Sequence, residues 1–321
     1  MSRVIHTGQA LVDYVFEIPK LPHRGGNVFA SGARRSAGGA VNILVAAARN
    51  GAVAVHAGAH GTGANGDLIR AALEADGVAV ANPPEPDLDS GICVCLLEPH
   101  ERTFVTTLGA ERSISASSLD RAAPVAGDIV CVDGYTLVEP GTAHPMLDWL
   151  ERLPDGIAVV LDPGADFAAQ PADVRRRALA VTSIWTSNAD EAVDLLGAQG
   201  VPRIMAQRGM AEAAGAVAGL LPNAAVVVVR DGPAGCAVYS GGVTHEVSGF
   251  RQKPVDTNGA GDAHTGILLA ARVAGCSWVD AARRANAGAA IKVTREGPAT
   301  APTADEIDAW LAARGEPVRD G

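Results

Sequence analysis

One short run of residues in this 321-residue chain has the types and spacing needed for phosphate chemistry: DTNGAGD at positions 256–262, followed by an apolar helical segment. Small residues at a helix start leave the first N–H groups free to converge on one point, where the helix dipole adds positive charge. We therefore expect Gly259, Ala260 and Gly261 to form an anion hole. Asp262, on the first turn, would repel a resting phosphate, so we expect it to take a proton from an attacking hydroxyl. An ordinary glycine-rich loop with a first-turn aspartate is the alternative.

The same run resembles the C-terminal signature of the ribokinase-like family of carbohydrate and nucleoside kinases, also called the PfkB family. Further motifs of that family follow its order along the chain: AGGAVN at 37–42, TSNADE at 186–191, GPAGC at 232–236 and VTREG at 293–297. Ordered motifs that span almost the whole chain are a specific signature.

The resemblance implies an ATP- and Mg²⁺-dependent kinase in which Asp262 is the general base and residues 259–261 hold the transferring phosphoryl group. It implies further roles for these residues: Gly38, Gly39, Asn42 and Asp13 for the acceptor; Asn188 and Glu191 for ATP and the Mg²⁺ with its waters; Gly232, Gly235, Asn286 and Ala289 for ATP; and Asp256 for a position beside the K⁺ site found in many members.

Departures from the family pattern limit these assignments. Asn258 and His264 stand where other residues are usual, and we expect His264 to pack against its neighbours rather than contact a phosphate. Ala40 and Val41 follow the paired glycines in place of the lysine of phosphosugar kinases, which favours an unphosphorylated acceptor. Arg102 begins a hairpin strand and has two open interpretations, an acceptor-site residue or a solvated turn residue.

Short apolar segments alternate with Ala-rich helical segments along the chain, which predicts an α/β fold with a three-layer, doubly wound, mostly parallel sheet. We expect a single ribokinase-like domain over residues 1–321. Strands are expected at 4–7, 52–56, 129–132, 158–161, 184–186 and 226–229, and helices at 40–49, 67–75, 143–152, 190–196, from 259 and from 277.

Two regions have the alternation of β-hairpins instead: 12–18 with 27–36, and 91–97 with 103–108. They predict a small β-sheet lid built from inserted segments at about residues 10–37 and 90–110. A β extension used only for dimerisation is the alternative, because exposed sheet edges associate readily. The resemblance adds the expectation of a homodimer formed through the lid.

Composition excludes several classes of protein. The net charge of −10 argues against a nucleic-acid partner, and no apolar stretch approaches a membrane span. Only Lys20, Lys253 and Lys292 are lysines and none follows a glycine, which rules out a Walker-type site. The five cysteines form no C-x-x-C pair, and no long apolar leader is present, so we expect a reducing cytoplasm.

A G-x-G-x-x-G run at 61–66 makes an NAD-dependent oxidoreductase the rival enzyme class. It lies at the second β/α step, and its acidic position falls in a proline-rich stretch, so we disfavour it. His56 and His60 span a glycine turn and are not expected to bind metal. Lys292 follows AAI in the manner of a protein-kinase lysine, but we assign it to a helix.

The hypothesis that these observations favour is an ATP-dependent kinase that phosphorylates a primary hydroxyl of a small sugar. A nucleoside kinase of the same fold stays open, as does a ligand-binding or regulatory protein that has lost activity. The retained Asp262, anion-hole residues and Glu191 speak against loss of activity.

Overall fold

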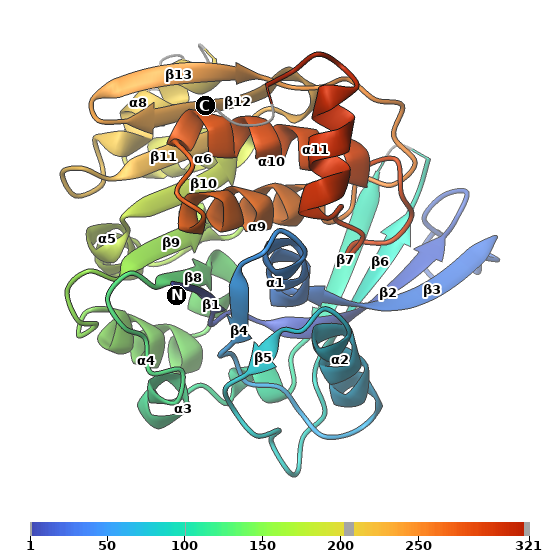
Figure 1. The fold of residues 1–321 in the computed structure, drawn as a ribbon. Helices are drawn as coiled ribbons and strands as arrows, with labels where there is room; N and C mark the ends of the chain where they lie inside the picture. Colours follow the sequence, from blue (N-terminus) through green and yellow to red (C-terminus); the bar gives the residue numbers. More distant parts are fainter. Residues whose placement is uncertain (1, 100, 202–208, 318–321) are drawn as a thin grey trace.

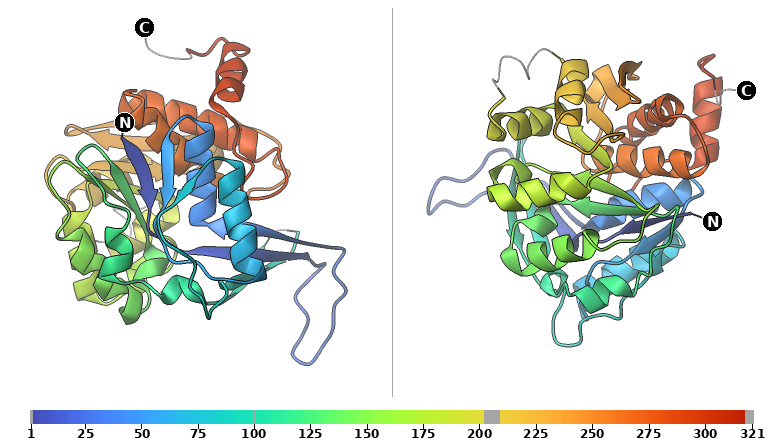
Figure 2. Two further views of the ribbon diagram at one scale, coloured as in Figure 1. Left: turned by 60° about the horizontal axis from the view of Figure 1, so that its bottom comes forward. Right: turned by 90° about the vertical axis from the view of Figure 1, so that its left-hand side faces the viewer.

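The computed structural model describes residues 2–99, 101–201 and 209–317, apart from the side chain of Arg102 (Figures 1 and 2). The expected role of Arg102 therefore lies outside the described residues. Among the described helices, none combines the length and the apolar character that a membrane crossing requires.

A large sheet of nine strands forms the centre of the molecule, in the order β13-β12-β11-β10-β9-β8-β1-β4-β5. Its strands are β1 Arg3–His6, β4 Val53–His56, β5 Ala79–Val80, β8 Ile129–Asp133, β9 Ala158–Asp162, β10 Ile184–Asn188, β11 Val226–Arg230, β12 Gly235–Ser240 and β13 Val243–Ser248.

All six expected strands are present in this sheet and pair in parallel. Their apolar runs are buried on both faces, as parallel strands covered by helices must be. The antiparallel strands β12 and β13 were not expected. β13 is an edge strand that is largely exposed, so its sequence carries little hydrophobic signal.

Two layers of helices cover the large sheet, and a further helix packs at the base of the small sheet. The helices are α1 Ala40–Arg49, α2 Ala64–Ala75, α3 Ala116–Asp120, α4 Pro140–Leu150, α5 Ala172–Val181, α6 Ala189–Ala198, α8 Met210–Ala218, α9 Ala260–Val273, α10 Trp278–Lys292 and α11 Ala304–Ala312.

The side chains of β11 point alternately into two separate cores. Val227 and Val229 pack in the core beneath α3, α4, α5, α6 and α8, while Val226 and Val228 pack in the core beneath α1, α9, α10 and α11. Figures 1 and 2 show these two layers on either side of the sheet. The three-layer α/β architecture predicted from the sequence is therefore confirmed.

A separate sheet of four strands, in the order β3-β2-β6-β7, lies beside the large sheet (Figure 1). Its strands are β2 Ala10–Glu17, β3 Gly32–Gly39, β6 Ile92–Leu97 and β7 Arg102–Thr107. β6 and β7 form the expected hairpin, and β2 pairs antiparallel with β3 and parallel with β6. We call this four-stranded sheet the small sheet.

The carboxyl ends of four neighbouring parallel strands carry polar side chains. Asp133 ends β8, Asp162 ends β9, Asn188 ends β10 and Arg230 ends β11. Because these strands are adjacent and parallel, their last residues meet at one edge of the sheet. In open α/β sheets this edge is where ligands bind.

Candidate active site

The DTNGAGD run forms the loop and first turn of α9. Gly259 has a φ of +73°, and a Cβ there would lie 2.6 Å from the carbonyl oxygen of Pro298, so only glycine fits. Ala263 donates its N–H to the Gly259 carbonyl at 2.9 Å, whereas the Ala260 N–H makes only a long 3.3 Å contact with Thr257 O. Among the described side chains, none caps this helix. Its first-turn amides therefore keep the capacity to bind an anion.

The Asp262 carboxylate is held by a neighbouring helix. Asn42 on α1 donates from Nδ2 to Asp262 Oδ2 at 2.7 Å. The pKa of Asp262 is raised to about 6, chiefly by burial and also by the negative charge of Asp162, while the Asn42 hydrogen bond and Arg230 act in the opposite direction. The carboxylate is therefore ionised at neutral pH and basic enough to accept a proton.

The small sheet brings a second carboxylate toward Asp262. Asp13 lies on β2 directly opposite Ser36 on β3, and burial followed by the charge of Asp262 raises the pKa of Asp13 to about 6. A Cβ on Gly38 would lie 2.5 Å from Asp13 Oδ2, so glycine lets the two strands and the carboxylate pack closely. Gly39 follows as the N-cap of α1, which carries Asn42.

Two buried polar atoms near Asp13 have no hydrogen-bond partner among the described residues: Ser36 Oγ and Asn42 Oδ1. Buried polar atoms are normally paired, and such exceptions call for an explanation. With Asp13 they offer one hydroxyl, one amide oxygen and one carboxylate, which are groups suited to binding several hydroxyls at once.

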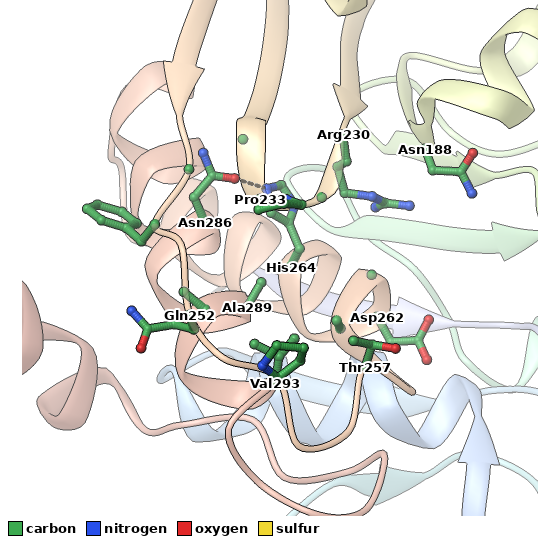
Figure 3. A pocket seen from close by; sticks show the side chains of 18 of the residues that line it. Asn188, Arg230, Pro233, Gln252, Thr257, Asp262, His264, Asn286, Ala289 and Val293 are labelled. Carbon is green, nitrogen blue, oxygen red and sulfur yellow. Dashed lines mark hydrogen bonds between the residues drawn. The ribbon is translucent and has the colours of Figure 1, made fainter. Parts of the chain in front are cut away.

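A cavity of about 510 Å³ opens on the other side of Asp262 (Figure 3). It is lined by all six residues that the sequence analysis assigned to ATP, together with apolar side chains. The lining residues that were expected are Asn188, Glu191, Gly232, Gly235, Ala260, Gly261, Asp262, Asn286 and Ala289. The cavity is large enough for a nucleotide-sized ligand.

Arg230 is a cavity residue that the sequence analysis missed. Its guanidinium Nη1 donates to Thr186 Oγ1 and Thr265 Oγ1, both at 2.7 Å, and Nη2 lies 3.7 Å from Asp162 Oδ2. The side chain is 12% exposed, and Gly261 packs against it. A fixed cation therefore stands next to the first turn of α9. A charged residue at the end of an apolar parallel strand is the signal that could have found it.

Asn188 and Glu191 form a reciprocal capping box at the start of α6. Glu191 N donates to Asn188 Oδ1 at 2.8 Å, and Asn188 N donates to Glu191 Oε2 at 2.9 Å. Burial, followed by the charge of Asp162, raises the pKa of Glu191 to about 7. Glu191 and Asp162 both line the cavity, and a pair of carboxylates there fits Mg²⁺, which takes one or two carboxylates with waters and phosphates.

His264 is buried and hydrogen-bonded to Asn286, at 3.1 Å between His264 Nε2 and Asn286 Oδ1 (Figure 3). Asn286 Nδ2 donates to the carbonyls of Val247 and Ser248, so its oxygen faces the ring and His264 Nε2 carries the proton. Burial and Arg230 lower the pKa of His264 to about 3, which keeps it neutral. His264 packs against Asn286 and also lines the cavity, so its expected lack of phosphate contact stays a prediction, and Asn286 anchors β13 and this wall of the cavity.

The oxygens of Asp256 are engaged by groups of the protein. Oδ1 accepts from the N–H of Asn258, Oδ2 accepts from the N–H of Gly297 and from Arg34, and the carbonyl oxygen accepts from Lys292 Nζ at 2.9 Å. A K⁺ ion needs such oxygens as ligands. Arg34 and Lys292 already place positive charge at these oxygens, so a K⁺ ion bound by Asp256 would meet like charge.

The G-x-G-x-x-G run at 61–66 opens α2, but its amides are occupied. Asp89 accepts hydrogen bonds from the N–H groups of Asn65 at 3.1 Å and Gly66 at 2.8 Å. A carboxylate of the protein thus takes the place where a pyrophosphate would bind in a dinucleotide fold. The oxidoreductase alternative loses its supporting motif.

His6, His56 and His60 are buried close to one another at the ends of β1 and β4, with ring centroids of His56 and His60 6.0 Å apart. Burial lowers the pKa of His6 to about 4 and that of His56 to about 3, so both are neutral. In the part of the chain that the structure describes, no three His, Cys, Asp or Glu side chains are arranged to hold a metal ion.

Comparison with known proteins identifies the family. The family model described as pfkB family carbohydrate kinase matches residues 1–305. An uncharacterized sugar kinase of Escherichia coli, YegV, is 29% identical over 95% of this chain and 92% of its own length, and an ATP-dependent ribose-1-phosphate kinase of Halopiger xanaduensis is 26% identical over 98% and 99%. The ribokinase of Giardia lamblia superposes with a TM-score of 0.84 at 21% identity, over 98% of this chain and 99% of its own. The chain belongs to the pfkB family of carbohydrate kinases.

Proposed function

We propose that this protein transfers the γ-phosphate of ATP to a primary hydroxyl of a small sugar, with Asp262 as the general base. The observation that carries the proposal is the position of Asp262 between two differently built spaces. The open cavity with Arg230 and the first-turn amides lies on one side, and Asp13 with the unpaired Ser36 Oγ of the small sheet and Asn42 Oδ1 of α1 lies on the other.

The residues supply positioning and charge rather than covalent chemistry. Asn42 holds Asp262 Oδ2, which leaves Oδ1 to accept the proton of the attacking hydroxyl. Gly259, Ala260 and Gly261 place backbone N–H groups where negative charge develops, and Arg230 adds a fixed positive charge beside them. Phosphoryl transfer depends chiefly on such positioning and electrostatic stabilisation.

The nucleotide would lie along the cavity wall that contains Gly232, Gly235, Asn286 and Ala289. Glu191, with Asp162 nearby, would hold Mg²⁺ and its waters. When bound, Mg²⁺ neutralises phosphate charge. K⁺ is not part of the proposal, because Lys292 and Arg34 already supply positive charge at Asp256.

The acceptor would contact Asp13, Asn42, Gly38 and Gly39. In the register of the small sheet, Asp13 has Ser36 and Cys93 as cross-strand neighbours, and Cys93 faces Thr106. These small side chains favour a sugar over an acceptor that needs aromatic stacking. We propose that the small sheet closes over the sugar as a lid and excludes water.

An ADP-release assay with ATP, Mg²⁺ and a panel of acceptors tests the proposal. The panel contains free pentoses and hexoses, sugar acids, sugar 1-phosphates and nucleosides, and mass spectrometry locates the phosphate. We expect a free sugar to raise the rate at least about tenfold above the acceptor-free rate, which is well inside the range of enzyme accelerations. A nucleoside as the best acceptor would establish the alternative kinase. Acceptor binding without ADP release would identify a silent ligand-binding protein.

The homodimer formed through the small sheet stays a prediction. Phe104 and Val105 on β7 are more than half exposed, at 54% and 57%, and β7 is an edge strand. An exposed apolar edge favours pairing with a second chain. Light scattering after size exclusion measures the mass in solution, and a monomer at assay concentration would contradict the prediction.

A further inference from the structure

Lys292, the last residue of α10, is buried although lysine almost always reaches solvent. Its exposed fraction is 0%, and it is among the largest fully buried side chains of the described residues. An ammonium group removed from water needs oxygen partners, because an uncompensated buried charge is very costly. The position of this ammonium must therefore be tied to specific acceptors.

The ammonium reaches the loop that precedes the anion hole. Lys292 Nζ donates to the carbonyl oxygen of Asp256 at 2.9 Å. Its charge also helps lower the pKa of the Asp256 carboxyl, after the hydrogen bond from the Asn258 N–H and against the effect of burial. Lys292 therefore acts on two groups of Asp256, its carbonyl oxygen and its carboxylate.

The same short loop is fixed against the segment that follows Lys292. Val255 N and Asp256 N both donate to the carbonyl of Val293, at 2.7 and 3.1 Å, and Gly297 N donates to Asp256 Oδ2 at 3.1 Å. Three residues after Asp256, Gly259 packs against Pro298 so closely that a Cβ would not fit. The residues at 292–298 thus form a support on which the anion-hole loop rests.

Lys292 is the positive charge at the centre of this support. Without it, the Asp256 carbonyl would lose a charge-assisted donor and the buried Asp256 carboxylate would lose a compensating charge. The loop would then relax, and the amides of residues 260–262 would lose the alignment that stabilises a transferring phosphoryl group. An ammonium is close to K⁺ in charge and size, so the side chain can do here what a bound monovalent ion would do.

We propose that the Lys292 ammonium is a built-in cation that positions the anion-hole loop, so that this chain needs no potassium for its reaction. The part about the reaction rests on the proposed function. Lys292 acts through the loop and is a positioning residue.

The first experiment uses the unmodified protein. Its melting temperature and its ADP affinity are measured in KCl, NaCl and tetramethylammonium chloride at equal ionic strength, and the rate is measured in the same salts if an acceptor is known. We expect melting temperatures to agree within about 1 °C and rates within about twofold, because no site awaits the ion. A K⁺-specific rise of the melting temperature or of the rate beyond these limits would overturn the proposal.

The second experiment removes the charge in two ways. Lys292→Met keeps the length of the side chain, whereas Lys292→Ala also opens space for an ion. We expect both to lower kcat by about tenfold or more with a smaller change in the KM for ATP, since the loop acts chiefly on the transition state. K⁺ and NH₄⁺, but not tetramethylammonium, should raise the melting temperature and activity of Lys292→Ala while leaving Lys292→Met unchanged.

Lys20→Ala, which removes an exposed lysine, is the matched control and should behave as the unmodified chain does. Full activity in Lys292→Met would refute the positioning role. If neither Lys292 variant folds, the salt comparison on the unmodified protein decides alone. If no acceptor is phosphorylated, the proposed function fails while the melting and ADP-binding measurements still test the built-in cation.

Discussion

Two glycine-rich segments, 61–66 and 259–262, each lead into a helix, but different groups face their first-turn amides. At α2 the carboxylate of Asp89 accepts from Asn65 and Gly66, so the helix start is satisfied from within the protein. At α9 the described side chains provide no cap, and the amides border the cavity. The acid of this second helix is Asp262, which Asn42 holds from another helix.

Glycine spacing alone does not decide whether a helix start can bind an external anion. Both segments have the small residues that expose backbone N–H groups, and both helices carry an acidic residue in the first turn. What separates them is a carboxylate that arrives from a loop more than twenty residues away at α2. The occupancy of the amides, which is a tertiary property, decides whether an external anion can bind.

Replacing the base at the open helix start should have the largest effect. In Asp262→Asn the side chain can no longer accept a proton, while its size and its contact with Asn42 are retained. We expect kcat to fall by about a thousandfold or more, with ADP affinity changed less than about twofold. Steady-state kinetics and calorimetric ADP titration measure the two quantities. Near-normal turnover in this variant would show that Asp262 is not the base.

Removing the charge of Arg230, beside the start of α9, should have the second-largest effect. Arg230→Met removes the positive charge that faces Gly261, so the developing phosphate charge loses one fixed partner. We expect kcat/KM for ATP to fall by about a hundredfold, the effect of losing one preorganised donor, and Arg230→Lys to recover part of it. Arg176→Met, at an exposed position on α5, is the control and should not change the rate. A rate loss of less than about threefold in Arg230→Met would remove Arg230 from the site.

A substitution at the start of α2, where Asp89 occupies the amides, should lower the free energy of unfolding and leave catalysis unchanged. Asp89→Ala takes away the acceptor of two α2 amides, and we expect the free energy of unfolding to fall by about 1 to 2 kcal/mol, as for loss of a helix cap. Asp87→Ala, an exposed neighbour, should stay within about 0.5 kcal/mol of the unmodified protein. Denaturant titration measures both. Gain of NAD binding by Asp89→Ala, detected by fluorescence titration, would show that the helix start retains a dinucleotide site.

The sequence predicts the fold and many of the residues that line the cavity because both depend on local signals. Buried parallel strands appear as continuous apolar runs, and Gly259 marks a left-handed backbone that other residues avoid. The Asn188 and Glu191 pair is also local, since a capping box needs only residues three apart.

Other parts depend on which segments the fold brings together. Arg230 becomes a site residue because β11 ends next to β10 and beneath α9, and Lys292 looks like an ordinary helix residue until the Asp256 loop covers it. The edge strand β13 is too exposed to leave a hydrophobic pattern, and β12, although its first four residues are buried, was not recognised as a strand. In the proposed function, side chains of the small sheet would decide the acceptor, and no local pattern encodes their contacts with a sugar.

The smallest predicted effect is a shift, along the pH axis, of the acidic side of the kcat/KM profile, which we call the acid limb. Asp262 has a pKa of about 6 in the folded protein and must be ionised to act, so kcat/KM should fall as the pH drops below about 6. Asp162 raises this pKa and Arg230 lowers it. Asp162→Asn should therefore shift the limb to lower pH and Arg230→Met should shift it to higher pH, each by less than about one unit.

Asp89→Ala should leave the limb in place, because Asp89 belongs to the other helix start. Profiles of kcat/KM measured between pH 5 and 8 test the three variants together. Because Asp13, Glu191 and Asp262 interact, the apparent pKa of the acid limb belongs to the three groups together. The two substitutions should still shift this apparent pKa in opposite directions, whichever group contributes most to it. Shifts of the same sign would mean that a group other than Asp262 controls the acid limb.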